Sequence, residues 1–308
     1  MQYSVFLLLS GALGSVLFAP LSVRCALLLG AIDTPDGVRH LHDRPTPRTG
    51  GLAPLFASLL LSLAFLTWDK TVAAWLAGGA LLSALGVTDD LYSLSPLLKL
   101  SAMLAVCALP AAFSLSPEVF SFIGFSFSLP SPLGKLFSFL WVLLLTNAFN
   151  LIDGLDGLSS TLALVGAASL FFLYENPASL LLFGAIFGFL PYNLPLRTPF
   201  WRGRRIQTRS FLGDTGSLFL GYSLAVLSLE SKAFPVATPL FFALPLFDLV
   251  RVFFTRLFQR KNPFHADRTH LHHRLLQKGY GTGAILTLCL LYALLFASVG
   301  LVATSFSL

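Results

Sequence analysis

The sequence predicts an all-α integral membrane protein, a bundle of about ten transmembrane helices that forms one domain over residues 1–308. Three observations lead to this prediction. The chain is 56% hydrophobic and only 11% charged, with a mean hydropathy of +0.79. Its apolar residues fall into stretches near the length that crosses a bilayer. Its basic residues gather in alternate loops, as in membrane proteins of defined orientation.

Ten apolar stretches supply the predicted spans, some short enough to need neighbouring helices or a locally thinned bilayer. In chain order they are 3–31, 52–67, 71–88, 97–113, 133–151, 158–174, 178–194, 211–229, 233–258 and 283–305. Pro239 and Pro245 fall inside the ninth stretch and predict a break or bend there. In the outer segment 114–132, Phe alternates with other residues from Phe120 onward, which indicates a small hairpin over the helix ends.

Charge orients the predicted bundle. The loops on one side are 32–51, 89–96, 152–157, 195–210 and 259–282. They hold 13 of the 20 Lys and Arg residues, whereas the opposite loops hold only Lys70 and Lys232. The positive-inside rule places the basic loops in the cytoplasm and both termini outside. All six histidines also lie in these five loops, so we expect the loops to form an active site. The net charge of +6 follows from this topology and an anionic substrate, and it does not indicate a nucleic-acid partner.

The most informative segment lies where the fifth span ends. Asn147, Asn150, Asp153 and Asp156 recur every third residue, so on a helix they would share one face. Polar groups beside lipid are costly, and these should face protein or a water-filled cavity. A row of hard oxygen ligands suits Mg²⁺ and a phosphorylated substrate. Ordinary capping of a helix C-terminus would not require four such groups at one spacing.

Two further segments carry carboxylates. Asp89 and Asp90 end the third span, with Lys99 shortly after. Adjacent carboxylates repel unless a cation or a proton neutralises one of them, although a solvated pair at a helix end would look the same. Phe211 opens a Gly-rich turn that enters the eighth span, where free N–H groups suit a phosphate. Asp214 in that turn is either a metal ligand or an ordinary N-cap.

The last cytoplasmic loop is rich in His and Arg. Its candidate side chains are Arg268, His270, His272, His273 and Arg274. Such groups can bind and polarise a diphosphate. A zinc site is the alternative, but no cysteine accompanies the histidines.

Two other polar groups have a simpler alternative. The first loop carries Arg39 and His42 in a rigid, basic setting that suits either phosphate contact or anchoring on the cytoplasmic side. Asp248 and Arg251 stand three residues apart in the ninth span, which predicts an intramembrane ion pair.

Together these motifs resemble the polyprenyl-phosphate N-acetylhexosamine-1-phosphate transferases of the WecA and MraY type, over nearly the whole chain. The blocks that carry the resemblance are Arg39-x-x-His42 with the Pro-Thr-Pro-Arg-x-Gly-Gly run at 45–51, Asp89-Asp90 with Lys99, the segment 147–156, Asn193 with Phe211-x-Gly-Asp214, and His270-x-His272-His273. The last block is similar to enzymes that use UDP-N-acetylglucosamine to start O-antigen, enterobacterial common antigen or teichoic acid, whereas the muramoyl-pentapeptide branch more usually has three consecutive histidines. His40 and Met103 depart from the family pattern, in which Lys and Gln are common.

The resemblance implies transfer of HexNAc-1-phosphate, most simply GlcNAc-1-phosphate, from a UDP-sugar to undecaprenyl phosphate with release of UMP. It implies a bacterial inner-membrane enzyme with a cytoplasmic site that uses Mg²⁺, with Mn²⁺ as a substitute, and it allows a homodimer. Under this interpretation Asp214, Asp153 and Asp156 hold the metal ion. Asp89 and Asp90 position or deprotonate the lipid phosphate or complete the metal shell, and the histidines clamp the diphosphate. The expected substrate contacts are Arg39, His42, Lys99, Asn147, Asn150, Asn193, Phe211, Arg268 and Arg274.

Several alternatives stay open at this point. The lipid phosphate attacks directly, or an aspartate is phosphorylated first. Phospho-N-acetylmuramoyl-pentapeptide transfer is the alternative activity within the same family. An ion-coupled transporter would instead place polar groups near the midplane and show inverted repeats. A CDP-alcohol phosphotransferase would need a tighter Asp-Gly-x-x-Ala-Arg pattern, which the sequence does not contain.

Overall fold

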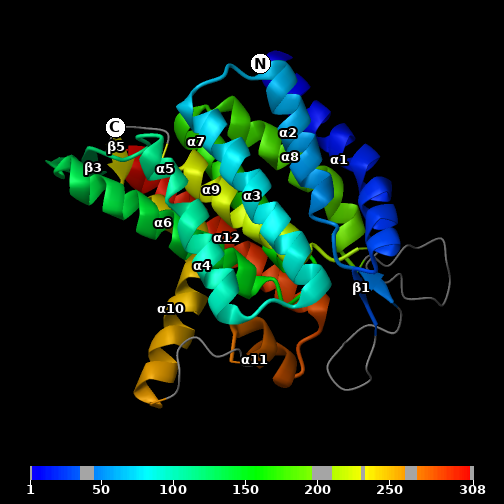
Figure 1. The fold of residues 1–308 in the computed structure, drawn as a ribbon. Helices are drawn as coiled ribbons and strands as arrows, with labels where there is room; N and C mark the ends of the chain where they lie inside the picture. The colour runs from blue at the N-terminus through cyan, green and yellow to red at the C-terminus, as the bar shows by residue number, and fades with distance from the viewer. Residues whose placement is uncertain (1, 35–44, 196–209, 230–232, 261–268, 306–308) are drawn as a thin grey trace.

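The computed structural model describes residues 2–34, 45–195, 210–229, 233–260 and 269–305. These residues are mostly helical (Figure 1). The α-helices are α1 Gln2–Leu29, α2 Leu52–Phe65, α3 Lys70–Tyr92, α4 Pro96–Cys107, α5 Leu109–Ala112, α6 Ser131–Ile152, α7 Leu158–Tyr174, α8 Pro177–Asn193, α9 Gly213–Leu227, α10 Ala243–Phe258, α11 Leu271–Gln277 and α12 Thr282–Ser305. The remaining elements are β1 Ile32–Asp33, β2 Thr46–Pro47, β3 Val119–Phe122, β4 Phe125–Ser128, β5 Ala233–Pro235 and the 3₁₀-helix η1 Thr238–Phe242. The candidates Arg39, His42 and Arg268 lie outside the described residues.

The apolar stretches of the sequence form helices, as expected. Four of these helices, α1, α3, α6 and α12, are long and apolar enough to cross a membrane. The shorter apolar helices are α2, α7, α8 and the stretch Pro96–Ala112. The prediction of a helical protein with several apolar helices is therefore confirmed, whereas ten spans of known orientation stay a prediction.

The ninth apolar stretch is broken, as its prolines predicted. It begins as strand β5, continues as the short η1 helix that holds Pro239, and becomes α-helical only at Ala243. Pro245 stands in the first turn of α10, where backbone N–H groups have no partner within the helix, so the absence of an N–H on proline breaks no helical hydrogen bond. The predicted break within 233–258 is therefore confirmed, and a strand and a 3₁₀ turn occupy the first part of the stretch.

The predicted hairpin is present. Strands β3 and β4 pair antiparallel, with Phe120 opposite Phe127. The sequence did not predict that β5 pairs parallel to β3 on its other side, with Val119 opposite Ala233. This small sheet lies at the end of the bundle where α12 ends, away from α11 (Figure 1).

Helix α9 is the centre of the bundle, and every residue from Thr215 to Leu227 is buried. Small residues let its neighbours approach closely. A Cβ on Gly86 of α3 would lie 2.4 Å from the backbone nitrogen of Thr215, and one on Gly221 would lie 2.7 Å from Cα of Thr146 in α6. The start of α9 is therefore held against the ends of α3 and α6.

Candidate functional site

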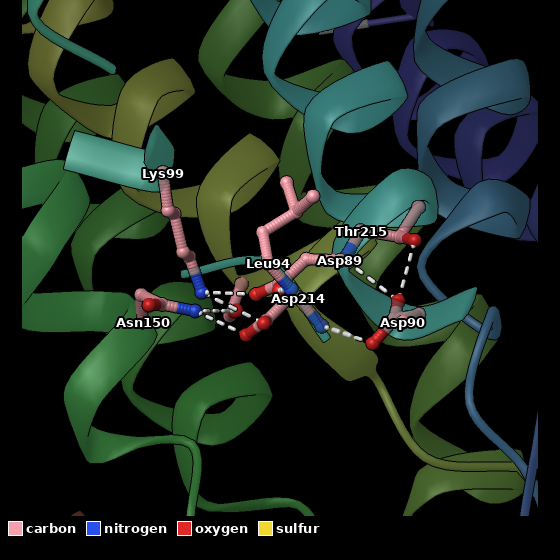
Figure 2. A network of polar contacts seen from close by, with 8 residues as sticks. Asp89, Asp90, Leu94, Lys99, Asn150, Asp214 and Thr215 are labelled. Atoms are coloured by element: carbon pink, nitrogen blue, oxygen red, sulfur yellow. Dashed lines mark hydrogen bonds and ion pairs between the residues drawn. The ribbon is translucent and has the colours of Figure 1, made fainter. Parts of the chain in front are cut away.

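Carboxylates from distant parts of the chain meet where α3 and α6 end and α9 begins (Figure 2). The turn into α9 requires glycine at position 213, because its φ is +70° and a Cβ there would lie only 1.9 Å from the carbonyl oxygen of Arg48. Gly51 contacts the same helix, since its Cβ would lie 2.1 Å from Cα of Gly216. Residues 45–51 of the first loop therefore pack against the start of α9.

Asp214 is the most highly connected of these carboxylates. Its Oδ2 accepts from Nζ of Lys99 at 2.7 Å, and its Oδ1 accepts from the amide of Asn150 at 2.5 Å. The same amide donates to Oγ of Ser217 at 2.9 Å. Lys99 also pairs with Asp89 at 2.8 Å. One ammonium group therefore bridges two carboxylates that the sequence places 125 residues apart.

Asp90 accepts hydrogen bonds from the first residues of α9. Its carboxylate accepts from the backbone N–H groups of Asp214 and Thr215, each at 3.1 Å, and from Oγ1 of Thr215 at 2.7 Å. Asp90 thus caps the N-terminus of another helix, where a negative charge is favourable. The expectation that this turn keeps its N–H groups free for a phosphate was therefore wrong for Asp214 and Thr215, because Asp90 binds both. Asp89 turns the other way, and its Oδ1 accepts from the N–H of Leu94 at 2.6 Å. Each of the two adjacent carboxylates therefore has its own donors, and the ammonium of Lys99 lies beside Asp89.

The expectation of one helix face from Asn147 to Asp156 was wrong in its second half. Helix α6 ends at Ile152, so Asp153 is its C-cap and Asp156 lies in the turn that follows. Gly157, at φ +77°, takes the left-handed conformation at the end of this turn, just before α7 begins. Desolvation and the negative charges of Asp214, Asp156 and Asp90 raise the pKa of Asp153 well above its ordinary value. A bound cation would relieve this repulsion.

The histidines reach this turn from α11. The ring of His272 is 1% exposed and packs on Gly154, where an added Cβ would lie 2.2 Å from Nε2. Burial first, and then the neighbouring histidines, lower the pKa of His272 to about 3. The ring of His273 lies 4.2 Å from that of His272, measured between centroids. Arg274 follows on the exposed side of α11. The structure therefore joins the histidine block to the Asp153–Asp156 turn.

Three other predicted substrate contacts, Asn193, Phe211 and Asn147, differ in how deeply they are buried. Asn193 is 2% exposed and uses its amide inside the protein, accepting from Oγ of Ser160 at 2.8 Å and donating to the carbonyl of Ser210 at 3.4 Å. Phe211 is half-buried in the segment before α9. Asn147 is half-buried on α6, one turn before the amide that binds Asp214. Asn193 thus fixes the end of α8 to the approach to α9.

Sequence reasoning assigned Asp248 only to an ion pair with Arg251. The structure confirms that pair at 2.7 Å and adds a contact between Asp248 and Nδ1 of His270, at 2.8 Å. The signal was the presence of a carboxylate inside an apolar stretch, which marks a functional residue by default.

Comparison with known proteins assigns the family. The model of Glycosyl transferase family 4 matches residues 72–232, which include the ends of α3 and α6 and the start of α9.

The chain belongs to Glycosyl transferase family 4.

Bacterial members with curated names are similar over most of their length. A probable undecaprenyl-phosphate N-acetylglucosaminyl 1-phosphate transferase of Bacillus subtilis is 32% identical over 280 residues, covering 86% of this chain and 75% of the relative. An undecaprenyl-phosphate alpha-N-acetylglucosaminyl 1-phosphate transferase of Thermotoga maritima is 33% identical over 280 residues, 88% of this chain and 81% of the relative. The Escherichia coli K12 protein of that name is 29% identical over 314 residues, 96% and 83%. As a member of this family, the chain is a phosphoglycosyltransferase.

Proposed function

We propose that this protein transfers GlcNAc-1-phosphate from UDP-GlcNAc to undecaprenyl phosphate and releases UMP, as the first step of a cell-envelope glycan. One observation carries the proposal: carboxylates from the end of α3 and the start of α9 meet at one end of an apolar helical bundle (Figure 2). With Asp156, the charges of Asp214 and Asp90 also raise the pKa of Asp153 in the turn after α6. The names of the relatives supply the sugar and the lipid. The His270-x-His272-His273 spacing supports a simple UDP-sugar over a peptide-bearing one.

The proposed topology places this end of the bundle in the cytoplasm of a bacterial inner membrane, with ten spans in one domain and both termini outside. The start of α1 and the end of α12 lie at the end of the bundle opposite α11, which supports termini on one common side (Figure 1). The distribution of Lys and Arg supports the orientation, because 13 of the 20 fall in the loops on the site side.

The reaction we propose is a direct displacement at phosphorus. An oxygen of the lipid phosphate attacks the β-phosphorus of the UDP-sugar, and a new P–O bond forms. The bond from that phosphorus to the oxygen that bridges the two phosphates breaks, and UMP leaves with the electron pair. A phosphate monoester is already anionic near neutral pH, so alignment and neutralisation of charge are the main requirements.

The carboxylates fit a divalent cation by their chemistry. Within the described part of the chain, no three His, Cys, Asp or Glu side chains already converge as a metal site. The excess of negative charge around Asp153 and the ammonium of Lys99 between Asp89 and Asp214 nevertheless indicate where a cation is favourable. We assign Asp214, with Asp153 and Asp156, to hold Mg²⁺ or Mn²⁺. When bound, the ion would neutralise the diphosphate and the leaving UMP.

The exposed side of α10 suits the polyprenyl chain. This helix projects from the bundle beside α11 (Figure 1), and several of its large apolar side chains are exposed. They are Phe247, Val250, Phe253, Phe254, Leu257 and Phe258. Because α10 also carries Asp248, which contacts the histidine block, a lipid lying along α10 would have its phosphate near that block.

A purified-enzyme assay tests the proposal. The protein, in detergent with undecaprenyl phosphate and Mg²⁺, is given a panel of UDP-sugars that includes UDP-MurNAc-pentapeptide, and UMP release is measured. We expect UMP from UDP-GlcNAc, none in excess EDTA, and none from Asp214→Asn. The matched control is Asp69→Asn, which changes the N-cap at the far end of α3 and should keep full activity because asparagine caps equally well. UMP release from the pentapeptide substrate alone, or full turnover in EDTA, would refute the proposal.

A further inference from the structure

Asp248 of α10 links that helix to the histidine block. Its side chain is almost fully buried, with the residue 1% exposed. Its Oδ2 contacts Nδ1 of His270 at 2.8 Å, and its Oδ1 accepts from the N–H of Leu271 at 2.9 Å. The guanidinium of Arg251 donates to the same Oδ1 at 2.7 Å and to the carbonyl of Thr269 at 2.6 Å. Two side chains of α10 therefore hold three consecutive residues that lead into α11.

The Asp248 contact fixes the tautomer of His270. An ionised carboxylate can only accept hydrogen bonds, and Arg251 and Leu271 keep this carboxylate surrounded by donors. Nδ1 of His270 is therefore the nitrogen that carries the proton. Nε2 points away from Asp248. This assignment holds for the neutral and for the charged ring, because Nδ1 carries a proton in both.

The ring of His270 lies beside the ring of His272. Its ring lies nearly parallel to that of His272, at an interplanar angle of 10° and a centroid separation of 6.2 Å. Both ring nitrogens of His272 are buried without a hydrogen-bond partner among the described residues. That ring packs on Gly154, between the two aspartates of the turn after α6. Buried polar groups are rarely left unpaired, so the unpaired nitrogens indicate a ligand that completes this part of the site.

We propose that Asp248 is a positioning residue for the transfer reaction: by accepting hydrogen bonds from Nδ1–H of His270 and from the N–H of Leu271, it sets the histidine block against the Asp153–Asp156 turn. The proposal rests on the proposed function, since the group that the histidines meet is the diphosphate. It assigns Asp248 a role in turnover beyond the ion pair with Arg251.

Asparagine at position 248 separates the two parts of this role. Its single oxygen, placed at the Oδ1 position, still accepts from Leu271 and Arg251. Its NH₂ group then faces His270, which has to accept at Nδ1 and carry its proton on Nε2. Asp248→Asn therefore inverts the tautomer of His270 and leaves the start of α11 in place.

Kinetics of single and double variants test the inference. We expect Asp248→Asn to lower kcat by about 100-fold or more, the scale of a misdirected acid–base group. KM for the UDP-sugar should stay within about threefold, because ground-state binding is unchanged. His270→Ala should be as impaired as the double variant, since Asp248 acts through His270. If the two losses multiply, or if Asp248→Asn keeps its kcat, the inference is wrong.

A spectroscopic measurement makes the inference independent of the reaction. In protein labelled with ¹⁵N-histidine, we expect His270 to be protonated at Nδ1 in the wild type, and at Nε2 alone in Asp248→Asn. Assignment uses the signal that is missing in His270→Ala. A wild-type His270 protonated only at Nε2 would overturn the inference even if the enzyme turns over. Failure of the wild type to release UMP from any UDP-sugar would refute the proposed function and leave this tautomer test in force.

Discussion

Substitution of Gly86 by alanine tests whether the carboxylates work only while α3 touches α9. The added Cβ would lie 2.4 Å from the backbone nitrogen of Thr215 and 2.5 Å from the carbonyl carbon of Asp214. Ordinary contact for a Cβ begins at 3.4 Å, so the start of α9 has to move by about 1 Å, because backbone atoms cannot rotate away. A displacement of about 1 Å at reacting groups can lower turnover by about 100-fold. Overpacking of this kind also costs about 1–3 kcal/mol of stability.

The assay is UMP release at saturating UDP-GlcNAc and undecaprenyl phosphate, with the apparent melting temperature measured on the same sample. Gly79→Ala is the matched control on the same helix, since its Cβ would meet only ring atoms of Phe219, at 3.1 Å, and a ring can shift. We expect the control to stay within about threefold of wild-type kcat, in keeping with a small side-chain adjustment. Wild-type kcat in a folded Gly86→Ala protein would show that the close contact between the helices does not set the geometry of the site.

Three further substitutions separate charge, proton binding and lipid contact. Lys99→Met leaves Asp214 without its ammonium partner, so the melting temperature in EDTA should fall below that of the wild type. The rise in melting temperature on adding Mg²⁺ should be larger than in the wild type. Equal rises in the two proteins would contradict the metal assignment. Because burial lowers the pKa of His272 from 6.5 to about 3, the unfolded chain binds a proton there that the folded protein does not. Stability should therefore fall as the pH drops below 6.5, and His272→Asn should flatten the change in melting temperature between about pH 7 and about pH 5. Phe254→Gln on exposed α10 should raise KM for undecaprenyl phosphate roughly tenfold through lost apolar contact, whereas Phe122→Gln, equally exposed on the outer hairpin, should leave it unchanged.

Local patterns in the sequence were sufficient for most of the fold. Apolar stretches of sufficient length predicted the long helices, and alternation around Phe120 predicted the hairpin. Pro239 and Pro245 predicted the break in the ninth stretch because proline fixes φ and lacks a donor. The pairing of β5 with β3 could not be predicted, since it joins segments that are more than a hundred residues apart and depends on how the bundle closes.

In the site, too, local sequence predicted which residues take part but not their long-range contacts. Spacing and residue type identified the carboxylates, but they could not say which groups each would meet. Asp90 caps α9, which lies 124 residues further along the chain, and Lys99 bridges two aspartates instead of reaching outward. The three-residue spacing from Asn147 to Asp156 suggested a continuous helix. Helix α6 ends at Ile152, so the two amides lie on the helix and the two carboxylates lie beyond it.

The site is built on two separate supports, and this arrangement bears on how it works. The carboxylate half rests on backbone contacts among α3, α6 and α9 that leave no room for an added methyl group at Gly86 or Gly221. The histidine half is held instead by side chains of α10, through Asp248 and Arg251. The halves meet where His272 lies on Gly154. A lipid that binds along α10 would therefore act on the histidine half and leave the carboxylate half unchanged. Occupancy of the lipid site should then alter the setting of the histidines before the diphosphate reacts, whereas the geometry around Asp214 should be the same with and without lipid.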